Sequence, residues 1–565
     1  MASNNNRLPA TPTPTTAIRL LYIPELLHLI FGFLSKKCNV SNARVCKLWS
    51  EIALDVIWRE VDNLVHMFTA LKPIIDLGRM DYAFVANPDV TDWIRFQKYA
   101  RRVRILCFSQ KHDDEHLFQI LDDVARTRIS LEILPNLHTL RWIDKSTYDL
   151  KHCLLFLHSG IKYFTISFHG QSILLADIFA RAPNLHTLTL HIPNQDIDMT
   201  SHAKVIAQNL PHLRKLVLPE FYYTSAVIQE LSLMRNLEVI EFEHELSVGN
   251  GDPMDVDSFN PVLAEGSFPA LWDLSLTAGI DDVERFFRKE FAPVNITTLY
   301  LNSYKKHTAS EVHSLLLALS QECQFLSRLH IILLDKRLNL SGIPSDEQIS
   351  FDTLRPLFLS PHLTWFELLH KYPLRITLDE VEELASRWPS VETLELNSEP
   401  LYTRKFSLDF RALLPFAKHC HKLEHLGIFI NDTGFEVPSA SSIIRPFRAL
   451  QTLNFGTSRL ENPVAVAIFL SLLFPPWCTL QYGITWTSCG TKEHRQLDPY
   501  IEAEISDRVG PWEEMSMLLP FLAEVRRDGR ERMNALQEEV EELRTQNRLL
   551  MDKAGIRAED SCVLA

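Results

Sequence analysis

The chain has 565 residues, of which 46% are hydrophobic and 23% are charged, a composition typical of folded protein and not of extensive disorder. Its formal net charge of −14 argues against a nucleic-acid backbone as the main ligand, because phosphate binding requires a dense basic face. A chain of this length exceeds a single core, so we expect several domains or one elongated array.

The amino-terminal lead and the cysteines indicate a cytoplasmic or nuclear protein. Residues 1–17 lack the charged start and apolar core of a signal peptide, and we expect them to be disordered. The nine cysteines show neither a C-x-x-C pair nor a regular spacing, which predicts reduced thiols. No stretch of 18 uninterrupted apolar residues occurs, so no membrane-spanning segment is predicted.

Residues 18–66 form the first predicted module, which is small and helical. Apolar residues at steps of three and four from Leu26 to Leu34 predict an amphipathic helix, and Pro24 stands at its entrance, where a missing N–H costs nothing. A second helix is predicted over residues 41–52. A segment this short makes a poor independent core, so apolar residues exposed on it require a partner surface.

The order P-E-L-L-x-x-I-F-x-x-L, then A-R-V-C-K-x-W and a closing Trp, resembles the F-box. The F-box is the docking motif of substrate receptors in Skp–cullin–F-box ubiquitin ligases, which are cullin–RING ligases. Asn39-Val40 stands where this family usually has Asp-Leu. The resemblance implies that the matching residues form or support the surface that binds a Skp-type adaptor. They are Pro24, Glu25, Leu26, Leu27, Ile30, Phe33, Leu34, Val45, Cys46, Trp49 and Trp58, and all but Glu25 are taken as adaptor-binding candidates. The alternative is a helical cap on the array that follows.

A repeated spacing, L-x-x-L-x-L, predicts an array over residues 95–490, after a connecting helical segment over residues 67–94. Two copies are nearly identical, PNLHTLRW and PNLHTLTL, and successive copies start 24 to 37 residues apart. The thirteen copies begin at Val103, Leu137, Ile161, Leu185, Leu213, Leu237, Leu271, Ile296, Leu326, Leu363, Val391, Leu423 and Leu450.

The spacing predicts strands that alternate with helices. Side chains alternate along a strand, so the last two apolar residues of each copy point to the same side. Helical apolar spacing recurs between copies, at residues 225–234, 309–319 and 377–388, the last with Thr377 or Asp379 as its cap. This pattern resembles leucine-rich repeats of the irregular, helix-containing type. An ordinary α/β domain with leucine-rich strands is the alternative.

We therefore predict an α/β chain in three parts. A helical F-box module is followed by an irregular leucine-rich repeat solenoid of parallel strands with helices, and the chain closes with a coiled-coil-like helix over residues 531–551. Residues 491–530 are expected to connect the solenoid to this helix.

The strand face of a solenoid exposes alternate residues and is the surface predicted to bind a target protein. Large aromatic residues supply much of the energy of protein interfaces, which favours Tyr300 and Trp365. The candidates are Tyr300, Asn302, Trp365, Glu367 and Glu395, and the same register turns Arg141, Thr165, His191, Glu241 and Phe429 outward.

Catalytic and metal-binding patterns were weighed and not favoured. His112, Glu115 and His116 match the H-x-x-E-H zinc pattern, but no third ligand is evident and a solvated helix start explains the charges. Residues 419–425 hold three histidines and a cysteine without a second pair at zinc spacing. Neither a glycine-rich phosphate loop nor a G-x-S-x-G elbow is found. We predict no metal, no cofactor and no enzymatic activity.

The tail has two features of its own. Heptad spacing over residues 531–551 places Asn547 at an a position and allows Glu539 to pair with Arg544 of a parallel partner, so a lone surface helix and a weak homodimer both stay open.

Residues 552–565 are expected to be flexible and end in Cys562-Val563-Leu564-Ala565, which fits the prenylation pattern. Prenylation would make the protein peripheral to a membrane, although the residues before Cys562 are acidic and supply no second, basic signal.

These features predict a substrate-recognition adaptor. It would bind a Skp-type adaptor of a cullin–RING ligase through its F-box, and an unidentified target protein through its repeats, for ubiquitination. The alternative is a leucine-rich repeat scaffold or regulatory interaction protein unrelated to ubiquitin, and a third reading is a hydrolase that uses the H-x-x-E-H residues.

Overall fold

The computed structural model describes residues 22–78, 82–109, 117–143, 150–170, 172–193, 197–243, 248–334, 346–401, 408–431, 445–475, 477–484 and 499–553. The chain divides into two compact units, the first comprising residues 1–256 and 261–271 and the second residues 257–260 and 272–565. The predicted H-x-x-E-H pattern, the lead and Cys562 lie outside the described residues. None of the described helices combines the length and apolar character needed to cross a membrane.

The first unit begins with three short helices around a small apolar core. These helices are α2 (Pro24–Gly32), α3 (Lys36–Asn42) and α4 (Lys47–Arg59). Leu27 and Phe31 of α2 pack against Ile52 and Ala53 of α4. The helix predicted over residues 41–52 is divided into α3 and α4, because the backbone is extended at Cys46, with φ −157° and ψ 171°.

The front helices lead directly into the first repeat. β1 (Glu60–Val61) follows α4 without a loop and pairs in parallel with β4 (Ile105–Ser109). The Arg102 guanidinium binds the carboxylates of Glu51 and Asp55 on α4 and donates to the Glu51 carbonyl oxygen at 3.0 Å. The strand pairing and the arginine together fix α4 against the start of the array.

The segment between α4 and the repeats, expected to be helical over residues 67–94, is only partly so. It contains a short antiparallel strand pair between two helices, with Phe68 and Phe96 stacked at 6.2 Å between ring centroids. The elements are α5 (Leu64–Thr69), β2 (Ile74–Asp76), β3 (Tyr82–Phe84) and α6 (Val90–Ala100). Strands of three residues are too short to show the alternation that identifies a strand in sequence.

The repeats of the first unit alternate strands and helices as predicted. Neighbouring strands pair in parallel with the apolar residues in register, for example Leu140 with Phe164 and Leu188 with Leu216. The strands after β4 are β5 (Thr139–Ile143), β6 (Tyr163–Ser167), β7 (Thr187–His191), β8 (Lys215–Pro219) and β9 (Val239–Glu243). The helices are α7 (Phe118–Thr127), α8 (Ser172–Arg181), α9 (Met199–Asn209) and α10 (Ser225–Leu231), with 3-10 helices η1 (Leu150–Leu155) and η2 (Pro253–Val256).

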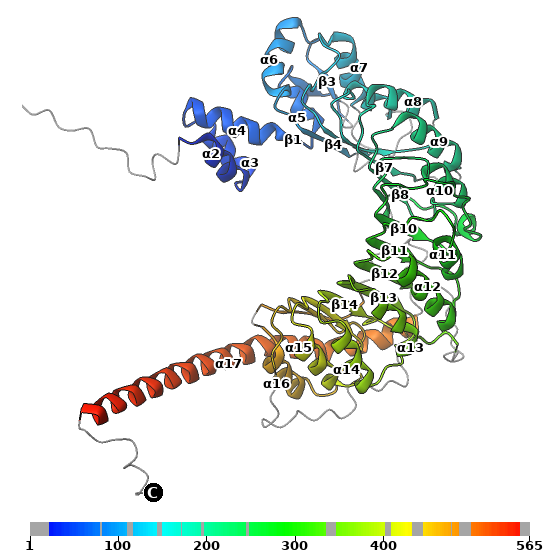
Figure 1. Cartoon of the computed structure of the whole chain (residues 1–565). Helices are drawn as coiled ribbons and strands as arrows, with labels where there is room; N and C mark the ends of the chain where they lie inside the picture. The colour runs from blue at the N-terminus through cyan, green and yellow to red at the C-terminus, as the bar shows by residue number, and fades with distance from the viewer. Residues whose placement is uncertain are drawn as a thin grey trace, which may run out of the picture. The chain divides into compact units, whose positions relative to one another are not determined.

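The second unit continues the same alternation. Its strands are β10 (Asp273–Thr277), β11 (Thr298–Asn302), β12 (Arg328–Leu333), β13 (Trp365–His370), β14 (Thr393–Leu396), β15 (His425–Ile428), β16 (Thr452–Asn454) and β17 (Thr479–Gln481). Its helices are α11 (Ile280–Phe287), α12 (Ala309–Glu322), α13 (Phe351–Leu354), α14 (Leu378–Arg387), α15 (Leu413–His419) and α16 (Pro463–Leu473), with 3-10 helices η3 (Arg355–Leu359) and η4 (Phe410–Ala412). In each unit the helices follow the strands along one side (Figure 1).

This arrangement confirms the predicted leucine-rich repeat solenoid. The last apolar positions of all thirteen predicted copies lie in or next to β4 to β16, and the inward-pointing residues are buried. The inward-pointing apolar residues of each strand are buried only by packing against the neighbouring repeats, so each repeat depends on its neighbours for stability. The three predicted helices also form, and Thr377 is the N-cap of α14, accepting a hydrogen bond from the Glu380 backbone N–H.

The closing helix is much longer than the predicted 531–551. α17 runs over Pro499–Lys553 and continues through Pro511 and Pro520, which would ordinarily end a helix. Its first half packs on α16, and Trp512 stacks on Phe455 just after β16, so that tertiary packing offsets the cost of the prolines. The apolar side chains that face the solenoid there are Ile505, Trp512, Met515 and Leu519.

Candidate protein-docking surfaces

The front helices expose an unusual number of large apolar side chains. On α2, Leu27 and Phe31 are buried and Ile30 is 46% exposed, while Phe33, directly after the helix, is 90% exposed. Val45, between α3 and α4, is 60% exposed. Exposed apolar residues of the same helices and their flanks also include Tyr22, Ile23, Leu29, Leu34 and Val40. Apolar exposure concentrated on so short a segment is typical of a protein-binding surface.

The residues predicted to bind an adaptor fall into an exposed and a supporting group. The exposed members are Pro24, Ile30, Phe33, Leu34, Val45 and Cys46. Leu26 is half-buried, and Leu27 lies fully inside the core. A partner protein would touch the first group directly, while Leu27 shapes the surface from within.

The two tryptophans of the motif both have an internal partner. Trp49 is half-buried and meets Phe31 edge to face, with 5.3 Å between ring centroids. Trp58 is half-buried against Tyr99 of α6, at 4.9 Å between ring centroids. Phe31 was not among the predicted site residues, although it is the phenylalanine of the order P-E-L-L-x-x-I-F-x-x-L and faces the core between Leu27 and Leu34.

Asn39, at the position where the sequence departs from the usual F-box pattern, is buried and hydrogen-bonded. Its side-chain amide donates to the carbonyl oxygens of Phe31 at 2.8 Å and Leu34 at 3.4 Å, at the end of α2. Its amide oxygen accepts from the Asn42 side chain at 3.2 Å. An ionised aspartate has no donor for the two carbonyls. The asparagine therefore closes the carboxyl end of α2 and holds α3 beside it.

Residues 24–63 match the F-box-like family. The front module is an F-box-like domain. No curated protein matches the chain. Among solved structures, that of the Rad7 and Elc1 complex of yeast contains a chain with 16% identity and a TM-score of 0.34, covering 62% of this chain and 82% of that one. The leucine-rich repeat-containing protein LegL7 of Legionella pneumophila has 12% identity and a TM-score of 0.30, covering 66% of this chain and 96% of that one.

The second candidate surface lies on the strand face of the solenoid that follows the F-box-like domain. In the second unit, one outward row contains Tyr300, His330, Glu367 and Glu395 on successive strands, and it continues at Gly427. Asn302 lies two residues after Tyr300 on β11, on the same face of the sheet. Asn302, Tyr300 and Glu367 are all half-buried. Parallel in-register pairing thus brings together residues that are about thirty positions apart in sequence.

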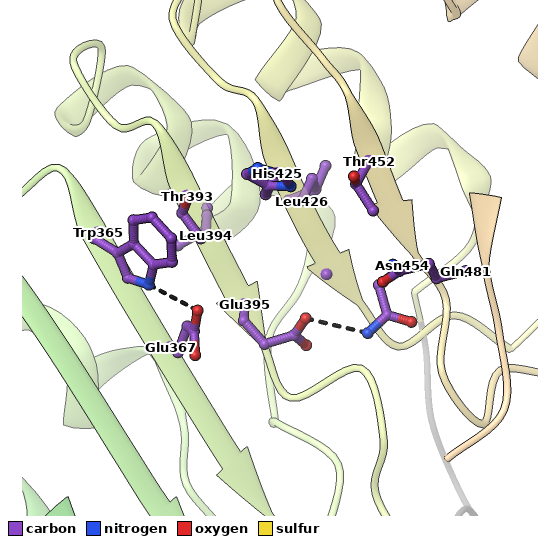
Figure 2. A pocket seen from close by; sticks show the side chains of 11 residues that line it. Trp365, Glu367, Thr393, Leu394, Glu395, His425, Leu426, Thr452, Asn454 and Gln481 are labelled. Atoms are coloured by element: carbon purple, nitrogen blue, oxygen red, sulfur yellow. Dashed lines mark hydrogen bonds between the residues drawn. The ribbon is translucent and has the colours of Figure 1, made fainter. Parts of the chain in front are cut away.

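An aromatic and charged cluster occupies this row on β12 and β13. The Trp365 indole N–H donates to Glu367 Oε1 at 2.7 Å, and His330 Nδ1 lies 2.9 Å from Glu367 Oε2 (Figure 2 shows the first bond). Arg328 lies over the Trp365 ring, 5.1 Å from its centroid, and Tyr300 stacks on His330 at 5.6 Å. Burial opposes ionisation of Glu367, but the hydrogen bond and charge of His330 outweigh it and lower the pKa of Glu367.

A pocket of about 240 Å³ adjoins this cluster on β13 to β17. Trp365 and His425 stand at one end of it, with Glu367 and Glu395 below them (Figure 2). The side chain of Glu395 folds over Gly427, where a Cβ atom would overlap its Oε2 atom. The remaining lining residues are Thr393, Leu394, Leu426, Thr452, Asn454 and Gln481. The glycine on β15 therefore makes room for the carboxyl group and leaves the hollow beside it.

Glu395 is held in place by hydrogen bonds but is poorly hydrated. Its Oε1 accepts from the Ser398 backbone N–H at 2.7 Å, and its Oε2 accepts from the Asn454 side chain at 3.4 Å. Burial raises the pKa of Glu395 to about 8, against the effect of the Ser398 bonds, and repulsion from Glu399 and Glu367 adds to the rise. At neutral pH this carboxyl group is therefore largely protonated.

The structure places other predicted residues away from any shared site. Phe429, expected to point outward, is 2% exposed and packs with Leu396 and Ile428, because the chain leaves the strand alternation after β15. His419 pairs with Glu382 at 2.8 Å, and burial raises the pKa of the Cys420 thiol to about 12. In the described part of the chain, no group of three or more His, Cys, Asp or Glu side chains is placed to hold a metal ion.

Proposed function

We propose that this chain is a substrate receptor, in which the F-box-like domain binds a Skp-type adaptor of a cullin–RING ligase and the repeats hold a target protein for ubiquitination. The observation that carries the proposal is the exposed apolar surface of the F-box-like domain, with Phe33 at 90% exposure. A monomeric surface rarely leaves so many apolar side chains in water without a partner.

The join between the two parts supports this role. β1 begins directly after α4, and Arg102 binds two carboxylates of α4. An adaptor seated on α2 to α4 would therefore be held rigidly to the first repeats, and not through a flexible linker. A rigid join of this kind is what presentation of a bound target to a ligase requires.

The F-box-like and leucine-rich repeat modules are binding modules, and the chemistry belongs to the partner ligase. We place the function in the cytoplasm or nucleus. Attachment to a membrane through Cys562 is a separate proposal, which mass spectrometry of the intact protein from cells tests by the mass of a prenyl group.

The double substitution Ile30→Ala/Phe33→Ala tests the adaptor proposal. Both side chains are exposed, so the fold should survive, and we expect retention of co-expressed Skp-type adaptor to fall at least about tenfold because apolar hot-spot contacts are lost. Affinity purification of the full chain with quantitation of bound adaptor measures this, with far-UV circular dichroism as the check on folding.

Val294→Ala/Leu359→Ala is the matched control, since it removes two exposed apolar side chains from the second unit. It should keep the adaptor. If the intact chain retains no adaptor, the receptor function is excluded and a leucine-rich repeat scaffold unrelated to ubiquitin becomes the better explanation.

We further propose that the target binds at the row formed by Tyr300, Trp365, Glu367 and Glu395, with Asn302 at its edge. The combination of half-buried aromatic rings with the pocket that this row borders favours it as the anchor point. Trp365 contributes a large flat surface that is already held in position by its bond to Glu367. A preorganised aromatic side chain loses little conformational entropy when a partner covers it.

Trp365→Ala separates target binding from adaptor binding. We expect proteins that co-purify with the intact chain through the repeats to fall about tenfold, while the adaptor stays at the wild-type level. Quantitative mass spectrometry of the two purifications measures both in one experiment, with Val294→Ala/Leu359→Ala as the control. An unchanged set of co-purifying proteins would place the target elsewhere on the chain.

A further inference from the structure

The heptad frame of residues 531–551 can be extended back along α17. The solenoid, however, covers the a and d positions only in the first half of the helix. In the first half, Trp512 and Met515 are buried, Leu519 is 8% exposed and Leu522 is half-buried. These residues occupy the a and d positions of the frame that continues at Met533. The first half therefore uses its a and d positions to pack on the solenoid.

In the second half the same positions are open to solvent. Every described side chain from residue 531 to residue 551 is exposed. The apolar a and d residues there are Met533 at 57%, Leu536 at 56%, Val540 at 45%, Leu543 at 55% and Leu550 at 64% exposure. Arg526 at a and Gly529 at d separate the two halves, and α17 extends past the last repeats as a single helix (Figure 1). A lone helix with an apolar stripe is a coiled-coil strand without its partner.

We infer that the stripe from Met533 to Leu550 binds the same stripe of a second copy of this chain, in a parallel two-stranded coiled coil. Charge complementarity identifies the occupant. Glu539 lies at a g position and Arg544 at the following e position, so a parallel copy forms two symmetric Glu539–Arg544 pairs across the interface. Among the described ion pairs, Arg544 contacts only Glu541 of its own helix, at 2.8 Å. An exposed pair of this kind contributes little to stability.

Asn547 fixes the orientation and the number of strands. In a parallel pair in register the two asparagines at this a position face each other and can exchange hydrogen bonds, which favours two strands. In an antiparallel pair centred on the stripe, Asn547 would face an apolar d residue, Leu536, and its amide would lose its partner. The remaining faces of residues 531–551 carry both acidic and basic side chains, as solvent-facing coiled-coil positions do.

The dimer goes beyond the receptor function and does not depend on it. Three heptads form a weak pair by themselves, but here each helix is already anchored to its solenoid through Trp512, so less ordering is needed on association. Two copies joined in this way would carry two F-box-like domains and two strand faces in one particle.

Sedimentation velocity of the full chain, over a wide range of concentration, tests the inference. The intact chain should show a reversible monomer–dimer equilibrium, and Leu536→Ala/Leu543→Ala should weaken it about 100-fold or more by removing apolar contact at both d positions of both chains. Alanine keeps the helix. Leu549→Ala is the matched control, because Leu549 is 56% exposed on the same helix but lies at a c position. A monomer at every concentration overturns the inference, and so does a dimer that the double variant leaves intact.

The orientation has its own test. Met533→Cys places a thiol at the first a position of the stripe, where a parallel dimer brings the two copies together under mild oxidation. In an antiparallel dimer the two thiols would be about 25 Å apart along the axis. We expect the disulfide-linked peptide containing residue 533 by mass spectrometry of the digested dimer, and none from Leu549→Cys. A dimer without the residue 533 crosslink overturns the parallel arrangement.

Discussion

Replacing Trp512 with alanine is expected to lower the free energy of unfolding of the second unit by about 3–5 kcal/mol, the range found when a buried large aromatic is truncated. Trp512 is 1% exposed and stacks on Phe455 at 4.7 Å between ring centroids. Its indole N–H donates to the Ser458 carbonyl oxygen at 2.9 Å. The side chain thus closes the end of the solenoid, where a terminal repeat would otherwise expose its core.

Urea denaturation followed by intrinsic fluorescence or circular dichroism measures the change. Trp512→Phe should cost less, since it keeps most of the stacking on Phe455 and loses the hydrogen bond to Ser458. Met517→Ala is the control on the same helix, because Met517 is 66% exposed, and it should unfold like the intact chain. Wild-type stability in Trp512→Ala would show that α17 does not close the solenoid in solution.

The repeats could be predicted from sequence because each copy carries its own signal. The apolar residues of a strand lie two positions apart, and the same spacing recurs thirteen times, so even an atypical copy such as Val103 with Leu106 and Phe108 is recognised from its neighbours. Burial then follows from alternation, and Leu106 and Phe108 are indeed buried. Local order and repetition point to the same fold.

Elements whose form depends on tertiary packing could not be predicted in this way. Pro511 and Pro520 are helix-breaking residues, so the sequence indicates a connecting segment over 491–530. That region is nevertheless helical from Pro499, and it packs on α16 and, through Trp512, on Phe455 and Ser458 just after β16. The break at Cys46 is hidden for a similar reason, since apolar spacing continues across it.

In the candidate target site, too, some features follow from the local sequence pattern and others depend on tertiary packing. Trp365 and Glu367 were predicted to point outward from alternation within one strand. The pocket, however, depends on how the side chains of five neighbouring strands, β13 to β17, pack together, and on Gly427 leaving space for the Glu395 carboxyl. The repeated spacing does indicate which positions of neighbouring strands pair, as at Glu367 and Glu395. How the side chains pack at those positions, and so whether a hollow remains, depends on tertiary contacts that a single-sequence pattern does not report.

The buried carboxyl of Glu395 leads to the second prediction of large effect, a dependence of stability on pH. The pKa of Glu395 is about 8 in the folded chain, well above the 4.5 of an unperturbed glutamate. Between these two values the folded state holds a proton that the unfolded state has released. Stability therefore falls as the pH rises through this range, and the fall is complete above about pH 8. Below pH 4.5 both states are protonated and the group has no effect.

Glu395→Gln should remove this dependence. The glutamine oxygen can accept from the Ser398 N–H as Glu395 does, and the variant carries no charge to bury. The variant should match the intact chain near pH 5 and exceed it near pH 9, by on the order of 2 kcal/mol once solvent screening around a half-buried group is allowed for. Thermal unfolding of both chains across this range gives the difference directly.

Glu392→Gln is the matched control, the same chemical change at an exposed position just before β14, and it should follow the pH profile of the intact chain. The groups that face Glu395 are Glu367 on β13, Asn454 on β16, and Glu399, and they stay unchanged in both variants. A difference between Glu395→Gln and the intact chain that is constant with pH would mean that Glu395 is ionised in the folded state. A cationic group of a target that entered the pocket would shift the same equilibrium, because it favours the ionised carboxyl and so releases the proton that the free receptor retains.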